Sequence, residues 1–102
     1  MNIPEKIKLN GVTYDVVWKD DMFEDEERLD GRINFSKNTI ELNKSSQSYQ
    51  SACRTFIHEL IHFILEEYNI DDCDNKIPAN EEALCDLMAK GLYQIFEDNK
   101  LY

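Results

Sequence analysis

Hydrophobic residues recur at helical spacing through the second half of this chain. Between residues 49 and 68 they cover most sides of a predicted helix, which is therefore expected to be largely buried. Ser46 or Ser48 can cap the first turn, because a serine hydroxyl accepts a hydrogen bond from the free backbone N–H groups there.

A second helix is predicted from about residue 81 to 97. Asn80 precedes it and is a suitable N-terminal cap. At about 100° per residue, several apolar side chains fall on one stripe that is expected to face the core. The members of this stripe are Leu84, Met88, Leu92 and Ile95.

The first half of the chain alternates hydrophobic with polar residues, which is typical of β-strands. Residues 5–18 predict a hairpin, because Asn10 and Gly11 suit the central positions of a type I′ turn. Residues 31–43 predict a second hairpin. The pattern predicts an α+β fold in a single domain, residues 1–102. Its small antiparallel sheet of three to four strands is expected to pack on two long helices.

An acidic segment, residues 19–30, lies between the two predicted hairpins. A run of this kind is usually a solvated loop or a short helix, and Met22, Phe23 and Leu29 are expected to hold it against the domain. A calcium-binding loop is the alternative. The segment lacks the carboxylate spacing and the internal glycine of an EF-hand, so the solvated loop or short helix is preferred.

Composition narrows the class of protein. A chain of 102 residues with 42% hydrophobic and 31% charged residues matches one globular domain. The net charge of −10 argues against nucleic-acid binding, because phosphates are bound by clustered lysine and arginine. Three cysteines without a Cys-x-x-Cys motif indicate free thiols in a reducing compartment. With no signal sequence or membrane span in the sequence, a cytoplasmic location is expected.

The strongest chemical signal is His-Glu-x-x-His at residues 58–62, which uses both histidines of the chain. Residues i and i+4 share one face of a helix, so His58 and His62 can hold one Zn²⁺ ion at about 2.0–2.1 Å. Glu59 lies about a quarter turn away, where it can take a proton from a water molecule at the metal. Buried histidines and a buried glutamate without partners would be costly, and a metal ion satisfies all three.

A catalytic zinc site needs a third protein ligand and an open position. Because no third histidine exists, the remaining candidates are carboxylates and Cys85. Glu82 and Asp86 lie one turn apart beside the apolar stripe of the second helix. We expect Glu82 to bind the metal and Asp86 to accept the spare N–H of a ligand histidine, which fixes the orientation of that ring.

Three alternatives stay open for this ligand set. Glu81 can replace Glu82 as the ligand. Both glutamates also have a purely structural interpretation, because acidic residues in the first turn of a helix interact favourably with its dipole. Cys85 as a fourth ligand would close the site and make the zinc purely structural.

Residues 58–62 followed by residues 82–86 resemble the gluzincin pattern of His-Glu-x-x-His and then Glu-x-x-x-Asp. The small size, and the run at residues 31–42 ahead of the helix, are similar to ImmA/IrrE-type metallopeptidases of bacteria, phages and mobile elements and to minimal gluzincins. The resemblance covers about residues 31–99. It implies a minimal zincin-like fold and a zinc-dependent metallo-endopeptidase.

The resemblance also implies roles for single residues. His58, His62 and Glu82 would be the ligands, Glu59 the general base and acid, and Asp86 the supporting carboxylate. The substrate would be a protein or peptide, such as a repressor-type regulator. Zincins hold an extended substrate against an edge strand, here expected at about residues 39–43. The sequence does not indicate an oligomeric state.

The chain departs from the gluzincin pattern in two places. Glu81 stands where thermolysin-like sequences carry asparagine. The sequence also lacks a clear counterpart of the downstream histidine or tyrosine that stabilises the oxyanion in larger gluzincins. Tyr93 is the preferred candidate for that role, ahead of Arg32, Arg54 and Tyr49. A missing donor lowers the rate by about 10²–10³. The alternative function is therefore a catalytically weak or inactive zincin-fold regulatory protein that acts by binding a partner.

Overall fold

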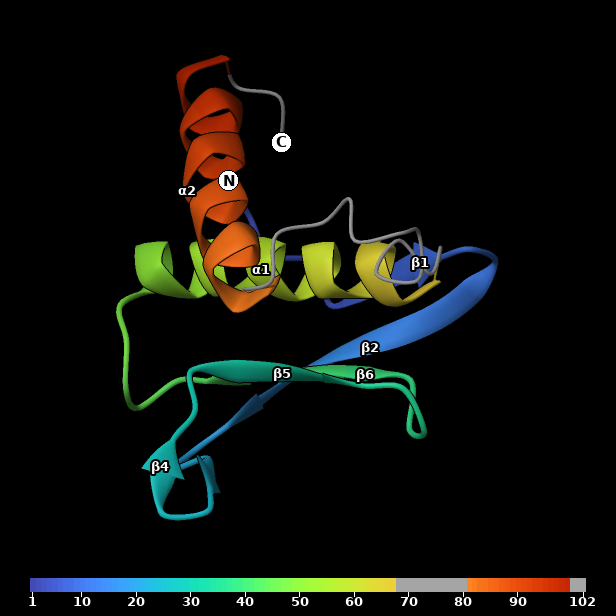
Figure 1. The fold of residues 1–102 in the computed structure, drawn as a ribbon, viewed down its shortest axis with the longest axis vertical. Coiled ribbons are helices and arrows are strands. Elements are labelled where there is room, and N and C mark those ends of the chain that lie inside the picture. Colours follow the sequence, from blue (N-terminus) through green and yellow to red (C-terminus); the bar gives the residue numbers. More distant parts are fainter. Residues whose placement is uncertain (68–80, 100–102) are drawn as a thin grey trace.

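The computed structural model describes residues 1–67 and 81–99, in which six strands and two helices form an α+β domain (Figure 1). The strands are β1 (Lys6–Leu9), β2 (Val12–Lys19), β3 (Phe23–Glu24), β4 (Glu27–Arg28), β5 (Gly31–Asn34) and β6 (Thr39–Asn43). The helices are α1 (Tyr49–Glu67) and α2 (Glu81–Asn99). The predicted α+β class is confirmed, whereas the predicted Asn80 cap lies outside the described residues. Neither described helix is long and apolar enough to cross a membrane.

Both predicted hairpins are present, as the antiparallel pairs β1–β2 and β5–β6. In the first, φ is 50° at Asn10 and 82° at Gly11, as a type I′ turn requires. In the second, the connection ends at Asn38 with φ of 54°, a conformation that asparagine tolerates better than most residues. Local turn chemistry therefore positions both hairpins.

The main sheet is mixed, and the prediction of a wholly antiparallel sheet is wrong. Its strand order is β1-β2-β6-β5, and β2 pairs with β6 in parallel. After β2 the chain continues to the far edge of the sheet, where β5 begins, and β6 then returns between β5 and β2. The prediction that residues 39–43 form an edge strand is also wrong, because β6 is central and β1 and β5 are the edges.

The acidic segment between β2 and β5 is neither a simple loop nor a helix. It contains the two-stranded ribbon β3–β4, whose turn has positive φ at Asp25 (50°) and Glu26 (69°). Met22 is buried as expected, but Phe23 is 52% exposed. The ribbon carries the chain to the edge of the sheet where β5 begins.

The helices form two further layers, with α1 against the sheet and α2 crossing α1 (Figure 1). Buried side chains between the sheet and α1 form one core: Tyr14, Ile40, Leu42, Phe56 and Phe63. A second core lies between α1 and α2: Ile57, Ile61, Leu65, Cys85 and Ala89. Among the described elements α2 packs on α1 alone, so one helix covers the sheet rather than the two expected.

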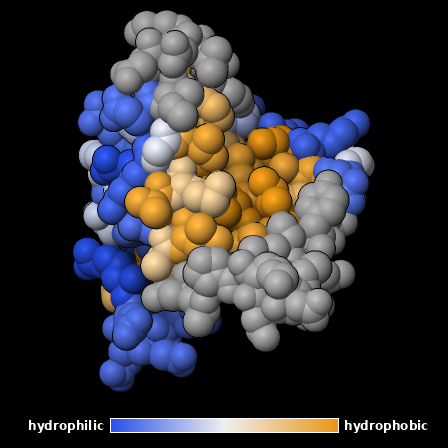
Figure 2. Space-filling view, turned by 45° about the horizontal axis from the view of Figure 1, so that its top comes forward, coloured by the Kyte–Doolittle hydropathy of each residue, from blue (hydrophilic) through white to orange (hydrophobic). Residues whose placement is uncertain are grey.

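The face of α2 that meets α1 agrees with the predicted stripe only in part. Leu84 and Leu92 pack against the core between the helices as expected, Met88 does not, and the side chain of Ile95 lies outside the described residues. Met88 is 44% exposed and Leu87 71% exposed, whereas Cys85 and Ala89 are 0% and 2% exposed. The small side chains of Cys85 and Ala89 let the two helices approach closely. Figure 2 shows one face of the molecule, on which a hydrophobic area lies beside a hydrophilic border. Because Cys85 lies against α1, Glu81, one turn before it on α2, also faces α1.

Ser48 caps α1 as one of the two serines predicted for this position. Its Oγ accepts a hydrogen bond from the backbone N–H of Ser51 at 3.1 Å, which satisfies one of the free N–H groups of the first turn. The other candidate, Ser46, instead donates to the carboxylate of Asp30 at 2.8 Å.

Gly31 lies where β5 passes close to α1. A Cβ atom here would lie 2.6 Å from Cγ2 of Thr55 and 2.9 Å from the backbone oxygen of Glu41. We expect Gly31→Ala to lower the free energy of unfolding by about 1–3 kcal/mol in urea denaturation, because the overpacked backbone must shift. Gly91→Ala is the control, since nothing lies within 4 Å of that Cβ. Replacing this helical glycine should raise stability by about 0.5–1 kcal/mol, and equal effects of both variants would contradict the packing described.

Candidate metal centre

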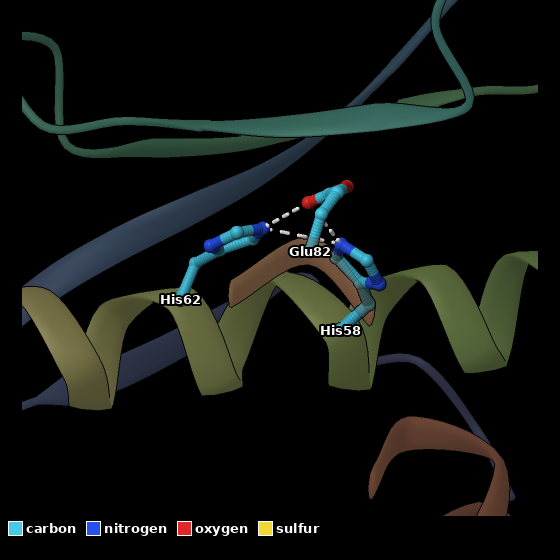
Figure 3. A group of neighbouring side chains, drawn as sticks. All are labelled: His58, His62 and Glu82. Carbon is cyan, nitrogen blue, oxygen red and sulfur yellow. Dashed lines mark hydrogen bonds and ion pairs between the residues drawn. The ribbon is translucent and has the colours of Figure 1, made fainter. Parts of the chain in front are cut away.

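Three side chains from the two helices converge beside α1 (Figure 3). His58 and His62 lie one turn apart on α1, with their Nε2 atoms 3.1 Å apart. Oε1 of Glu82, in the first turn of α2, lies 2.9 Å from Nε2 of His58 and 2.6 Å from Nε2 of His62. The structure therefore brings together the three residues that the sequence predicts as ligands.

The spacing of these three atoms fits a zinc ion. A triangle of this size admits an ion at about 2.0–2.1 Å from every corner, the usual length of zinc–nitrogen and zinc–oxygen bonds. Two imidazoles and one carboxylate are also a common ligand set of catalytic zinc sites. The crossing of α2 over α1 creates this geometry, because it places the first turn of α2 above the central turns of α1.

A second carboxylate holds the other nitrogen of His62. Oε1 of Glu81 lies 2.9 Å from Nδ1 of His62, so that Nδ1–H donates to the carboxylate and Nε2 is left for a metal. The prediction gave this role to Asp86. In the structure Asp86 instead forms an ion pair with Lys90 at 3.0 Å. Asp86 shares a helix face with Glu82, whereas the neighbouring face, which carries Glu81 and Cys85, packs against α1.

Glu59 is 7% exposed and lines a cavity together with His58 and Glu82. Burial raises the pKa of its carboxyl group, although the imidazoles of His62 and His58 and the backbone of Ile33 act in the opposite direction. A raised pKa brings a carboxyl group nearer to the range in which a general base works best at neutral pH.

The carboxylates create a site that favours positive charge. Burial lowers the pKa of His62, but its hydrogen bonds with Glu81 and Glu82 outweigh that effect and raise it. Burial raises the pKa of Glu82, but its hydrogen bonds with His58 and His62 outweigh that effect and lower it. A divalent cation would be favoured by the same arrangement that favours a proton on His62.

Cys85 belongs to a different group of side chains. Its ligand atom lies within 4.8 Å of those of His62 and Glu81, and it is absent from the group formed by His58, His62 and Glu82. Burial, with neighbouring glutamates, raises the pKa of its thiol to about 12, so without a metal ion the thiol is protonated at neutral pH. These observations do not support the alternative of a closed structural site with Cys85 as the fourth ligand.

A cavity of about 490 Å³ lies beside the three converging side chains. One wall is the segment from β4 to the start of β5, and α1 and α2 form the others. The lining residues are Arg28, Leu29, Asp30, Gly31, Ser51, Arg54, Thr55, His58, Glu59, Glu82, Asp86 and Lys90. The cavity therefore borders the side of the site where Glu59 lies.

Of the four candidates for an oxyanion donor, only Arg54 lines this cavity. The ring of Tyr93 lies instead under the guanidinium of Arg54, and the Cζ atom of Arg54 is 5.9 Å from the centre of that ring. Tyr49 stacks on Trp18 with ring centres 6.2 Å apart, and Arg32 pairs with Glu41 at 2.6 Å. The preferred assignment of Tyr93 is therefore not supported by its position.

Sequence reasoning missed two cations that line the cavity, Arg28 and Lys90. Lys90 could have been found, because it follows Glu82 and Asp86 at intervals of one helical turn. Arg28 had no such signal, since it lies in an acidic segment and reaches the cavity only through the β3–β4 ribbon.

Glu81 should measurably support metal binding. We expect Glu81→Ala to weaken zinc affinity about 10–100-fold, the usual effect of removing the carboxylate that orients a ligand histidine. Competition with a chromogenic chelator measures this affinity. Asp86→Ala removes an equal charge from the same helix without a bond to His62, and it is the control. A larger loss in Asp86→Ala than in Glu81→Ala would overturn the assignment.

Comparisons with protein-family models, with curated proteins and with solved structures find no match for this chain.

Proposed function

We propose that this chain is a zinc-dependent endopeptidase that hydrolyses a peptide bond in a protein or peptide substrate. The observation that carries the proposal is the convergence of Nε2 of His58, Nε2 of His62 and Oε1 of Glu82 to within 3.1 Å of one another. Buried Glu59 and a cavity adjoin them. Three protein ligands beside an accessible cavity suit a catalytic zinc site, whereas a structural site is closed by four.

Zinc held by His58, His62 and Glu82 would supply Lewis-acid chemistry, which makes a water molecule more acidic and polarises the scissile carbonyl group. Glu59 removes the proton from the water molecule as its oxygen attacks the carbonyl carbon. The same carboxyl group then delivers the proton to the leaving nitrogen as the C–N bond breaks. A pKa raised by burial suits both roles of Glu59, because the group must hold the proton between the two steps.

The free edge of β5 is the proposed position of the substrate backbone. Among the described strands, β5 pairs with β6 alone, and its first residue, Gly31, lines the cavity together with His58. An extended peptide can add to such an edge through main-chain hydrogen bonds. A domain this small offers little surface for selecting a sequence, so the scissile segment is proposed to belong to a protein partner.

The proposed setting is the cytoplasm, and the proposed partner is a repressor-type regulator. Cys53 and Cys85 are buried free thiols, which are typical of a reducing compartment. The regulator is suggested by the resemblance to ImmA/IrrE-type metallopeptidases, and such a protein would share that compartment.

One observation favours a second candidate function, a regulatory protein that binds a partner without cleaving it. No tyrosine, and no histidine besides His58, is among the described residues that line the cavity. The usual oxyanion donors of larger gluzincins therefore have no counterpart there, which would lower the rate about 10²–10³-fold. In that case partner binding would persist in Glu59→Gln, and no cleavage product would form with the wild-type protein.

Metal-dependent cleavage of a proteome-derived peptide library tests the proposed function. We expect the zinc-loaded protein to produce new peptide termini, detected by mass spectrometry. A chelator should abolish these products, and added Zn²⁺ should restore them. Products that persist unchanged in the chelator would contradict a zinc-dependent mechanism.

A further inference from the structure

The cavity beside the metal centre extends along α1 away from the two histidines. Its α1 wall carries Ser51, Arg54, Thr55, His58 and Glu59, whose spacing places them on one face of the helix. Arg54 lies one turn before His58, about 6 Å along the helix axis. An extended peptide advances about 3.3 Å per residue, so Arg54 is about two substrate residues from the metal ligands.

Arg28 and Arg54 both line the cavity, and the guanidinium group of each lies over an aromatic ring. The Cζ atom of Arg28 lies 5.9 Å from the ring centre of Phe23, and that of Arg54 lies 5.9 Å from the ring centre of Tyr93. Neither arginine forms an ion pair with a carboxylate in the described part of the chain. A guanidinium held over a ring keeps its N–H edge available for a planar acceptor.

The carboxylates that line the cavity are Asp30, Glu59, Glu82 and Asp86, and Glu82 contacts His58 and His62 rather than an arginine. Asp86 pairs with Lys90 at 3.0 Å, and Asp30 accepts a hydrogen bond from Ser46 at 2.8 Å. Two arginines that have no acidic partner among the described residues therefore line one cavity in a chain of net charge −10. Arg28 comes from β4 and Arg54 from α1, so two separate elements supply the positive charge.

We propose that Arg28 and Arg54 form a carboxylate-binding subsite, which gives the enzyme a preference for substrates with an acidic group near the scissile bond. This inference rests on the proposed peptidase function. Arginine binds carboxylates through paired, charge-assisted hydrogen bonds, which are among the stronger polar contacts in proteins. The carboxylate can come from an aspartate or glutamate side chain within about two residues of the scissile bond, or from the substrate C-terminus.

Binding to the zinc-loaded Glu59→Gln variant tests the subsite without turnover. The probes are short peptide libraries that are acetylated and amidated, with glutamate at one central position or glutamine in its place. A third library carries the central glutamine and a free C-terminal carboxylate. Titration calorimetry measures each affinity in this background, alone and combined with Arg28→Gln or Arg54→Gln. Lys37→Gln removes an exposed cation outside the cavity and is the matched control.

We expect the glutamate library to bind about tenfold more tightly than the glutamine library. Each arginine variant should reduce this ratio, and Lys37→Gln should keep it. Preferential binding of the third library would identify a C-terminal carboxylate as the ligand and would equally support the subsite. Equal binding of all three libraries, or a preference that survives in both arginine variants, would overturn it.

The same libraries separate failure of the subsite from failure of the peptidase. Wild-type cleavage of the glutamine library at the same rate as the glutamate library would leave the peptidase intact and remove the subsite. Arginine-dependent binding of the glutamate library without any cleavage by the wild-type protein would retain the subsite and remove the peptidase.

Discussion

Replacing Glu59 by glutamine should lower the rate of peptide hydrolysis about 10²–10⁴-fold, the usual contribution of general acid–base catalysis. Glutamine has nearly the same shape as glutamate but cannot accept or deliver the proton. Glu59 is 7% exposed, and burial raises the pKa of its carboxyl group, so the charged form is disfavoured there and a neutral side chain should fit without loss of fold. Zinc affinity should stay within a few-fold of wild type, because Glu59 is not one of the converging ligands.

Glu66→Gln is the matched control for this variant. It makes the same substitution on the same helix, at an exposed position, and should leave hydrolysis unchanged. Rates are measured on the peptides that the wild-type protein cleaves, with bound zinc determined for every sample. Hydrolysis by Glu59→Gln at the wild-type rate, with zinc bound, would exclude Glu59 as the general base.

Replacing His58 by alanine should weaken zinc binding about 10²–10³-fold. Structural zinc sites with four ligands bind the ion with an apparent free energy of about 10–16 kcal/mol, so one ligand contributes about 2.5–4 kcal/mol. Nε2 of His58 lies 3.1 Å from Nε2 of His62 and 2.9 Å from Oε1 of Glu82, and no other described residue offers a ligand atom in that group. Loss of the ion should abolish hydrolysis as well.

Chemical denaturation with and without zinc measures this effect independently of activity. At a free zinc concentration about 1,000 times the wild-type Kd, the wild-type protein should gain about 4 kcal/mol of unfolding free energy, and His58→Ala only about 0.4–1.4 kcal/mol. The two metal-free proteins are the internal control, and their free energies of unfolding should differ much less from each other. An equal gain from zinc in both proteins would mean that the ion binds elsewhere.

Sequence reasoning succeeded where short-range chemistry decides the structure. Asn10 and Gly11 predict the first turn because few other residues adopt positive φ at both positions. The helix that carries His58 and His62 was predicted to span residues 49–68 and spans Tyr49–Glu67. Because residues i and i+4 of a helix always share a face, the pairing of the two imidazoles followed from their spacing alone.

The sheet topology could not be read from the same local signals. A hairpin pattern predicts which strands are neighbours along the chain, but not where the second hairpin attaches to the first. Here β6 inserts beside β2, which makes their pairing parallel and leaves β5 at the edge. The strand predicted to hold the substrate, β6, is therefore the neighbour of β5, the edge strand that borders the cavity.

Which carboxylate reaches the candidate ligand histidines depends on the rotation and direction of α2. A helical wheel predicts that Glu81 and Cys85 share one face and Glu82 and Asp86 the next, but not which face meets α1. The small side chains of Cys85 and Ala89 decide it, and Glu81 rather than Asp86 reaches His62. Because α2 crosses α1 instead of running alongside it (Figure 1), residues beyond its first turns lie away from the candidate metal centre.

X-ray absorption at the zinc edge of the purified, zinc-loaded protein tests the central claim most directly. We predict one Zn²⁺ per chain, bound by nitrogen and oxygen atoms alone at about 2.0–2.1 Å, with scattering from two imidazoles. The Glu82→Ala variant should lose one oxygen ligand or the ion itself. A sulfur ligand at about 2.3 Å, or a spectrum with fewer than two imidazoles, would contradict coordination by His58, His62 and Glu82.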